Sequence, residues 1–278
     1  MSLFSSSRGV RAEVAERAQR LEVPFNRFGI DPFGVSRHHV ERAFGVACWF
    51  YRHYFRVNVH GVHNVPARGR AMLIGNHSGG VALDAAMVMC SLILEMEPPR
   101  LVHSMVEKFI TTVPHLSLWT KRCGQVTGLP EHAVQLLRAD RPLLVFPEGS
   151  RGTAKLYPER YSLVDFGSGF MRLALQTGAP IVPFAFLGGG AAIPTVYNAE
   201  GLGRLLGAPY VPLTPYLLAL PLPVRLDIVY GAPLVFDGDG RENDDVIFGY
   251  VAEVKKTVAE LIERGRRIRA GTLAARGD

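Results

Sequence analysis

A histidine and an aspartate that follow an apolar run are the residues of this chain best suited to catalysis. The run covers residues 71–74 and ends in Gly75-Asn76, and His77 and Asp84 come after it. A neutral histidine accepts a proton near neutral pH, and a nearby carboxylate orients its ring and stabilises the imidazolium. The pattern therefore predicts a general base, His77, supported by Asp84. The alternative is that His77 only caps the following helix and that Asp84 is a solvated acid of its first turn.

A second polar group follows another apolar run. Residues 142–146 are apolar throughout and lead directly into Pro-Glu-Gly-Ser-Arg at residues 147–151. A strand that ends there delivers the Glu148 carboxylate to the edge where ligands of open α/β sheets bind. Arg151 carries a planar guanidinium that suits a phosphate. The sequence thus favours a binding turn over the alternative, an ordinary surface turn.

The elements that must position these residues are strands and helices in alternation. Residues 142–146 and 180–187 are apolar along their whole length. Apolar strands separated by helical segments are typical of a largely parallel sheet that helices cover on both faces. Residues 57–62 and 225–230 alternate between apolar and polar positions, which predicts two further strands. We therefore expect a single α/β domain with a largely parallel or mixed central sheet flanked by helices.

Amphipathic helices are expected before this domain, in an N-terminal region of residues 1–56 that precedes the α/β domain of residues 57–278. Residues 8–21 carry apolar side chains at helical spacing among mixed charges, and a second such helix begins at Ser36. Aromatic and basic side chains near Trp49 are typical of a helix that lies among lipid headgroups. Alternatively, the apolar stripe of this second helix is buried in the domain.

The span from residue 205 to residue 224 carries no charge. It is long enough to cross a bilayer, but five prolines interrupt it, so a continuous spanning helix is not expected. We expect either an apolar lobe that lines an acyl tunnel or rests on a membrane, or a buried irregular loop.

Composition narrows the class of protein. The 278 residues are 48% apolar, which is enough for a sizeable core. A net charge of +6 and a pI near 9.4 favour anionic partners, and no zinc-finger spacing or RNA-binding signature supports nucleic acid.

Three cysteines without a Cys-x-x-Cys pair argue against a disulfide framework or a zinc site. His60 and His63 have a metal-like spacing but no third ligand nearby. The start of the chain lacks the apolar stretch of a secretory signal, so we expect a cytoplasmic protein.

Four blocks of the sequence, in order, resemble those of the glycerophospholipid acyltransferase family, whose best-known members are the 1-acyl-glycerol-3-phosphate acyltransferases. The blocks are Asn76-His77 with Asp84, Gly124 with Val126, residues 146–151 (Phe-Pro-Glu-Gly-Ser-Arg) and residues 179–183 (Ala-Pro-Ile-Val-Pro). The likeness covers residues 61–234, and the third block is the most specific.

The first block departs from the usual family pattern. Members of the family usually have four residues between the histidine and the aspartate, whereas six lie between His77 and Asp84. Gly79 and Gly80 would allow a wider loop to fold back, because glycine adopts backbone conformations that other residues avoid. A less-studied branch of the family shares this spacing and has a longer third block, which residues 155–172 resemble.

The resemblance implies a glycerol-3-phosphate acyltransferase-like fold and an acyl transfer reaction. The fatty acyl group would move from a thioester of coenzyme A or acyl carrier protein to a hydroxyl of a lysophospholipid or related glycerolipid. His77 would remove the hydroxyl proton and Asp84 would steady the imidazolium. The further residues expected to bind substrate are Asn76, Gly124, Glu148, Gly149, Ser150, Arg151 and Lys155.

The partners implied are the acyl thioester, the alcohol acceptor and an anionic membrane surface, with the protein bound peripherally to the inner face of the membrane. No metal or redox cofactor is expected. Two other functions stay open, a lipid-binding or lipid-transfer protein with a degenerate site and a hydrolase that uses His77 and Asp84 to activate water on a lipid ester or thioester. No Gly-x-Ser-x-Gly elbow is present, so a serine nucleophile is not expected.

Overall fold

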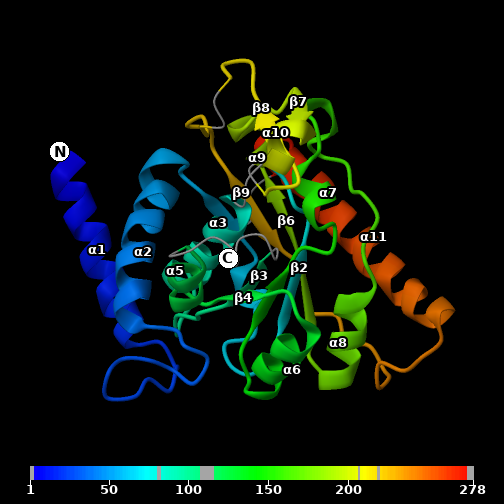
Figure 1. Cartoon of the computed structure of the whole chain (residues 1–278), viewed down its shortest axis with the longest axis horizontal. Coiled ribbons are helices and arrows are strands. Elements are labelled where there is room, and N and C mark those ends of the chain that lie inside the picture. Colours follow the sequence, from blue (N-terminus) through cyan, green and yellow to red (C-terminus); the bar gives the residue numbers. More distant parts are fainter. Residues whose placement is uncertain (1–2, 80–82, 107–115, 206, 218–219, 274–278) are drawn as a thin grey trace.

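A computed structural model of the chain describes residues 3–79, 83–106, 116–205, 207–217 and 220–273. Its centre is a seven-stranded sheet (Figure 1). The strands, in their order across the sheet, are β1 (Asn58–His60), β9 (Asp227–Tyr230), β6 (Ile181–Leu187), β2 (Met72–Gly75), β5 (Leu143–Val145), β3 (His103–Val106) and β4 (Gln125–Thr127). The apolar runs at 71–74, 142–146 and 180–187 therefore form three neighbouring strands in the middle of the sheet.

The sheet is mixed but mostly parallel, as the sequence predicts. Strands β6, β2, β5, β3 and β4 all run in the same direction. Strand β9 is antiparallel to β6, and β1 runs parallel to β9. Because β2 and β5 are parallel neighbours, the residues that follow Gly75 and Val145 emerge at the same edge of the sheet, which we call the carboxyl edge.

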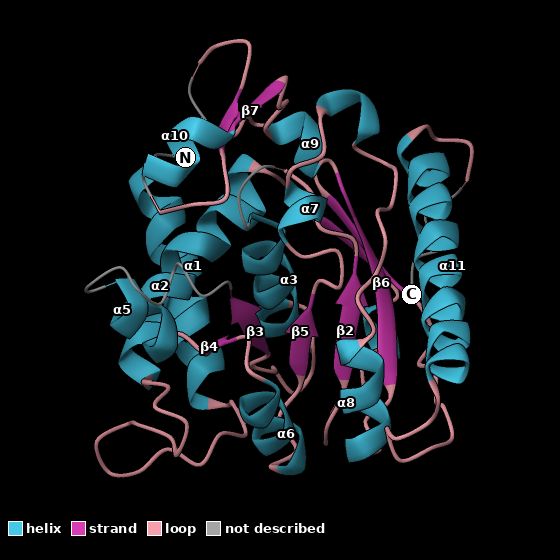
Figure 2. Cartoon of the chain, turned by 45° about the vertical axis from the view of Figure 1, so that its right-hand side comes forward, coloured by secondary structure: helices cyan, strands magenta, loops and turns pink. Residues whose placement is uncertain are grey.

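Helices cover both faces of the sheet (Figure 2). On one face lies α3 (Leu83–Leu94), and α1 (Leu3–Gln19) and α2 (Arg37–Trp49) pack outside it. On the other face lie α6 (Pro130–Arg138), α8 (Gly169–Thr177) and α11 (Asp244–Arg269). Strand β2 feeds both cores, since Leu73 belongs to the first hydrophobic cluster whereas Met72 and Ile74 belong to the second.

The N-terminal helices share the first hydrophobic cluster with the sheet. The apolar stripe of α1 includes Val10 and Val14, and that of α2 includes Val40 and Phe44, all of them buried. Helix α2 continues into one π-helical turn, η1 (Phe50–Tyr54). The apolar spacing of α2 would also fit a helix at a membrane interface. In this structure, most of the apolar stripe of α2 is buried in the core instead.

Short elements complete the carboxyl edge. They are α7 (Ser150–Thr153), the 3₁₀ turn η3 (Tyr157–Glu159), α9 (Gly189–Ala192), α10 (Glu200–Leu205) and a two-stranded antiparallel sheet of β7 (Tyr197–Ala199) and β8 (Val211–Leu213). Elsewhere lie the 3₁₀ turn η2 (Val62–Asn64) and α5 (Leu116–Arg122). Within the described ranges, no helix has the length and apolar character needed to span a bilayer.

Candidate active site

His77 lies at the carboxyl edge, two residues beyond the end of β2. Gly75, the last residue of β2, packs against Phe184 of the neighbouring strand so closely that a side chain at position 75 would overlap the ring. The next residue, Asn76, is buried and forms two hydrogen bonds with the backbone of Phe186. Its Nδ2 donates to the carbonyl at 2.9 Å, and the Phe186 N–H donates to its Oδ1 at 2.7 Å. Asn76 thus anchors the His77 loop to β6, and its amide is occupied by the backbone.

Asp84 reaches His77 in spite of the six intervening residues. Its Oδ2 lies 2.6 Å from His77 Nδ1 and accepts the backbone N–H of Ser78 at 2.9 Å. Its Oδ1 accepts the N–H of Ala85 at 2.8 Å, and the whole residue is buried. These donors stabilise a carboxylate in the first turn of α3, where the helix dipole also favours negative charge.

The contact with Asp84 also fixes the chemistry of the imidazole. A carboxylate at Nδ1 favours the tautomer in which Nδ1 carries the proton, so that the Nε2 of His77 is left to accept one. Phe146 stacks on the ring, with centroids 4.2 Å apart and planes 13° from parallel. Only 13% of the His77 side chain is exposed. The sequence analysis did not predict the contact with Phe146. Its position at the end of an apolar strand, two residues before Glu148, is the feature of the sequence that could have indicated it.

Glu148 joins the second polar group to the first. Its Oε1 accepts the backbone N–H of His77 at 2.8 Å, and its Oε2 accepts the N–H of Val164 at 2.9 Å. The Nζ of Lys155 donates to both oxygens, at 3.1 and 2.9 Å, and to the carbonyl of Ser162 at 3.0 Å. Both charged side chains are buried. The sequence analysis predicted that Glu148 and Lys155 bind substrate. In the structure, their charged groups form hydrogen bonds with each other and with backbone groups.

The turn after Glu148 packs directly under the histidine. Gly149 has φ of +58° and ψ of −153°, a conformation that favours glycine, and begins the short helix α7. A side chain at Gly152 would meet the Cβ atoms of both His77 and Glu148 at 2.7 Å. Sequence reasoning did not single out Gly152.

Of the other residues predicted to bind substrate, two lie on the turn after Glu148 and one lies elsewhere. Arg151, on α7, is exposed, and its Nη2 donates to the carbonyl of Asp165 at 3.0 Å. Its neighbour Ser150 is half-buried. Gly124 is not brought into this cluster, because it precedes β4 and its nearest neighbours are Leu101 and His103, at the start of β3.

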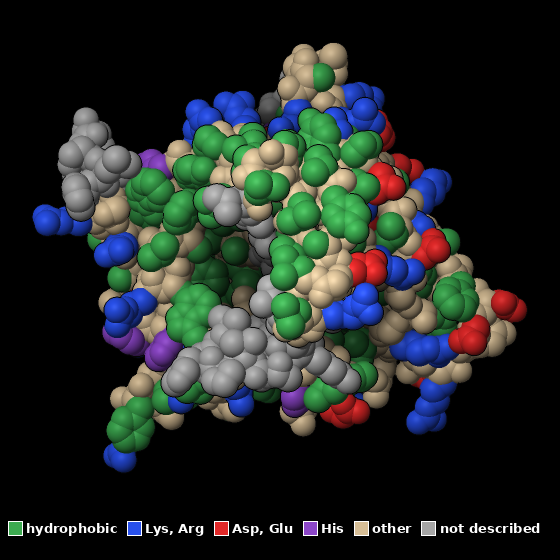
Figure 3. Space-filling model, turned by 45° about the horizontal axis from the view of Figure 1, so that its top comes forward, with side chains coloured by type: hydrophobic (Ala, Val, Ile, Leu, Met, Phe, Trp, Pro, Cys, Tyr) green, Lys and Arg blue, Asp and Glu red, His purple; other side chains and the backbone are tan. Residues whose placement is uncertain are grey.

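The face of the molecule at the carboxyl edge is apolar and hollowed. Figure 3 shows hydrophobic side chains gathered around a hollow on this face, with arginine and lysine side chains around its margin. An apolar hollow on the face where the His77 loop emerges suits a substrate with an apolar chain.

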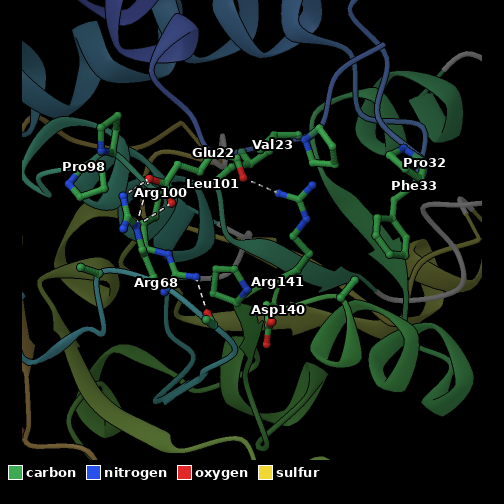
Figure 4. Close-up of a pocket in the computed structure, with 16 residues that line it drawn as sticks. Glu22, Val23, Pro32, Phe33, Arg68, Pro98, Arg100, Leu101, Asp140 and Arg141 are labelled. Carbon is green, nitrogen blue, oxygen red and sulfur yellow. Dashed lines mark hydrogen bonds and ion pairs between the residues drawn. The ribbon is translucent and has the colours of Figure 1, made fainter.

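Two cavities lie away from the histidine. One, of about 360 Å³, is lined by residues that precede β2, β3 and β5, among them Arg68, Arg100 and Arg141 (Figure 4). The Arg68 guanidinium pairs with the Glu22 carboxylate, and Arg141 Nη1 donates to the Glu22 carbonyl at 3.3 Å. The other cavity, of about 440 Å³, lies beside β4. The first cavity is at the edge of the sheet opposite His77, and neither cavity is lined by His77 or Asp84.

No cluster among the described residues brings together three or more histidine, cysteine or acidic side chains that could hold a metal ion. The spacing of His60 and His63 is therefore not completed by a third such residue in that part of the chain.

Comparison with known proteins identifies the family. A family model described as Acyltransferase matches residues 56–187. The Mycobacterium leprae protein ML2427 is 32% identical over 256 residues, which cover 86% of this chain and 69% of the relative. The protein Rv0502 of Mycobacterium tuberculosis is 31% identical over 254 residues, covering 86% and 71%.

A more distant relative and a solved structure are also similar to this chain. A human protein named "DGAT1/2-independent enzyme synthesizing storage lipids" is 24% identical over 227 residues, covering 78% of this chain and 64% of the relative. The crystal structure of the 1-acyl-sn-glycerophosphate acyltransferase PlsC from Thermotoga maritima has a TM-score of 0.53 at 16% identity, covering 94% of this chain and 83% of that one. That structural match confirms the expected fold. This chain belongs to the glycerophospholipid acyltransferase family.

Proposed function

We propose that the protein transfers a fatty acyl group from a thioester of coenzyme A or acyl carrier protein to a hydroxyl of a lysophospholipid or related glycerolipid. The observation that carries the proposal is the 2.6 Å contact between His77 and Asp84, at the sheet edge that also holds the third family block. Membership of the acyltransferase family supports the same reaction class.

In the proposed mechanism, His77 acts as the general base. Its Nε2 takes the proton of the acceptor hydroxyl while the hydroxyl oxygen attacks the thioester carbonyl carbon. Asp84 stabilises the imidazolium that results. The tetrahedral intermediate collapses, the carbon–sulfur bond breaks, and the departing thiolate takes the proton from His77. The products are an oxygen ester and a free thiol, and the reaction needs no metal or redox cofactor.

Two observations bear on the identity of the acceptor. An exposed guanidinium on Arg151 supports an acceptor with a phosphate or another anionic group, because arginine suits such groups. The name of the human relative, which refers to storage lipids, supports testing glycerides as well. We also propose that the protein works at the inner face of an anionic membrane, where these acceptors lie.

Mass spectrometry of the products tests the reaction. The protein is incubated with an acyl-CoA or acyl carrier protein thioester and a panel of lysophospholipids, mono- and diglycerides and fatty alcohols. A new ester that disappears in His77→Ala and persists in His132→Ala, a change at an exposed histidine of α6, is the expected result. Release of free fatty acid alone would indicate a hydrolase, and tight lipid binding without either product would indicate a carrier.

A further inference from the structure

A lobe with few charged residues, 190–224, rises from the carboxyl edge. Of the 35 residues from 190 to 224, only Glu200 and Arg204 are charged. The lobe nevertheless exposes large apolar side chains, with Leu205 at 81%, Leu217 at 76% and Leu220 at 63% exposure. The described residues that share this exposure in the lobe are Val196, Tyr197, Leu202, Leu205, Tyr216, Leu217, Leu220 and Leu222. Exposed apolar side chains that gather in one segment point to an interaction surface.

Hydrogen bonds hold the lobe over the turn that carries Glu148. Asn198 Nδ2 donates to the carbonyl of Ala154 at 2.6 Å, and the Tyr210 hydroxyl donates to Thr153. The backbone N–H of Tyr157 donates to the carbonyl of Thr195 at 2.8 Å. The lobe therefore lies at the same edge of the sheet as His77, as the positions of β7, β8 and α10 above β2 also show (Figure 1).

The lobe is continuous with the end of the second N-terminal helix. The Tyr54 hydroxyl donates to the carbonyl of Pro221 at 2.8 Å, which places η1 beside the lobe. Phe50, the first residue of η1, is 38% exposed. Earlier in this helix, Val40 and Phe44 are buried. We call Phe50 and the eight lobe residues named above the apolar rim.

Exposed arginines flank the apolar rim. Arg56 follows η1 and Arg225 follows the lobe, and the two chain segments are joined by a hydrogen bond of 3.3 Å from the Leu226 N–H to the Phe55 carbonyl. Arg204 is exposed on α10. Apolar side chains bordered by arginine are complementary to a bilayer that carries anionic headgroups, because the hydrocarbon buries the former and the headgroups attract the latter.

We propose that the apolar rim docks the protein on an anionic lipid bilayer, so that the hollow at the carboxyl edge opens toward the membrane (Figure 3). The inference deepens the proposed function, because it names the surface through which the site meets a lipid acceptor. In this proposal the lobe and η1 contact the membrane, whereas α1 and most of α2 belong to the core.

Vesicle flotation tests the proposal in the His77→Ala chain, so that binding is measured without turnover. The probes are phosphatidylcholine vesicles with and without 30% phosphatidylglycerol. The expected result is that Leu217→Asp with Leu220→Asp lowers the partition coefficient at least tenfold. Arg56→Gln with Arg225→Gln should remove most of the gain that phosphatidylglycerol provides. Leu217 has φ of +65°, a backbone conformation that aspartate tolerates better than leucine, so this change adds no backbone strain.

The matched control is Val246→Asp with Phe248→Asp. These two residues are 40% and 53% exposed near the start of α11, away from the carboxyl edge, and the control should bind as the parent does. Circular dichroism and thermal melting check that every variant folds. Equal binding by the leucine variant and the control would overturn the proposal, as would failure of the parent chain to bind either vesicle. Sedimentation equilibrium would also overturn it if the parent were a dimer that the leucine variant dissociates, because the rim would then be an interface between copies. If the wild type bound the vesicles but transferred no acyl group, the proposed function would be rejected, whereas the apolar rim would still be a membrane-binding surface.

Discussion

The backbone N–H of His77 donates to the carboxylate of Glu148 at 2.8 Å, across 71 positions of sequence. The third family block thus holds the main chain of the candidate base, while Asp84 holds its ring. Glu148 is in turn held by Lys155, so the position of His77 depends on a buried ion pair.

The ion pair gives a stability prediction. Lys155→Met leaves the buried Glu148 carboxylate without its cation, and removal of one partner of a buried pair costs about 3–5 kcal/mol. The double variant Glu148→Gln with Lys155→Met should be less destabilised than the sum of the two single variants, because neither partner is then left charged and alone. Urea unfolding of the four proteins measures this coupling. In the variants that fold, kcat should fall while KM changes little, whereas a raised KM with unchanged stability would assign Lys155 to substrate binding instead.

Gly152 gives a test of packing beneath the histidine. Gly152→Ala places a methyl group 2.7 Å from the Cβ atoms of His77 and Glu148, so the loop must move. We expect a loss of about 1–3 kcal/mol of stability and a marked fall in kcat. Gly169→Ala is the control, since nothing lies within 4 Å of the added atom at that helical position. Similar activity in the two variants would mean that the His77 loop adjusts freely.

The fold and the two polar groups could be predicted because they depend on local patterns. Apolar runs marked β2, β5 and β6, and parallel strands bring the residues that follow them to one edge. The partners of Glu148 and Asn76 could not be predicted in this way, because they are backbone groups and a lysine whose approach depends on the tertiary packing. Both side chains are polar and lie in family blocks, so the resemblance suggested substrate contacts.

Amphipathic spacing in α2 likewise left two interpretations open. Whether its stripe faces a core or a membrane depends on what packs against it, and that information lies in α1 and α3, far from Trp49 in the sequence. Gly124 was assigned to the site through the resemblance, although a residue that precedes a parallel strand lies at the opposite edge of the sheet from the residues that follow β2 and β5.

Asp84 gives a prediction about the role of the carboxylate. Asp84→Asn keeps the shape of the side chain but removes the charge that stabilises the imidazolium and the tautomer. We expect kcat to fall by about 10²- to 10⁴-fold, as for the corresponding change in a serine protease triad, with a smaller effect on KM. Steady-state kinetics of acyl transfer measure this effect. Wild-type kcat in this variant would mean that Asp84 only anchors the loop through the Ser78 N–H.

Arg151 gives a prediction about the acceptor. If its exposed guanidinium binds a phosphate, Arg151→Ala should raise KM for a phosphate-bearing acceptor by about 10- to 100-fold, with kcat less affected, because a remote anchor contributes mostly uniform binding. KM for an uncharged glyceride should not change. Arg138→Ala removes another exposed arginine, on α6, and serves as the control. Equal KM shifts with charged and uncharged acceptors would argue against a phosphate contact.

His103 gives a prediction about acid stability. The residue is fully buried, and burial, followed by the positive charge of Arg141, lowers its pKa to about 3. The unfolded chain binds a proton at this histidine below about pH 6.5, and the folded chain does so only near pH 3. Between about pH 6.5 and pH 3 the unfolded state therefore holds more protons at this position, and the free energy of unfolding falls by about 1.4 kcal/mol for each unit that the pH decreases within that window.

His103→Gln removes that titration, and His132→Gln, at the exposed histidine of α6, is its control. Urea unfolding at several pH values between 7.5 and 4.5 measures each slope. The difference between wild type and His103→Gln should be constant above pH 7 and should shrink as the pH falls, because only the wild type loses the contribution of a neutral buried imidazole. Carboxylates titrate alike in all three proteins, so they cancel in this comparison. Parallel curves for wild type and His103→Gln would show that His103 takes up its proton in the folded and unfolded chains alike, and acid lability would then have to come from other groups.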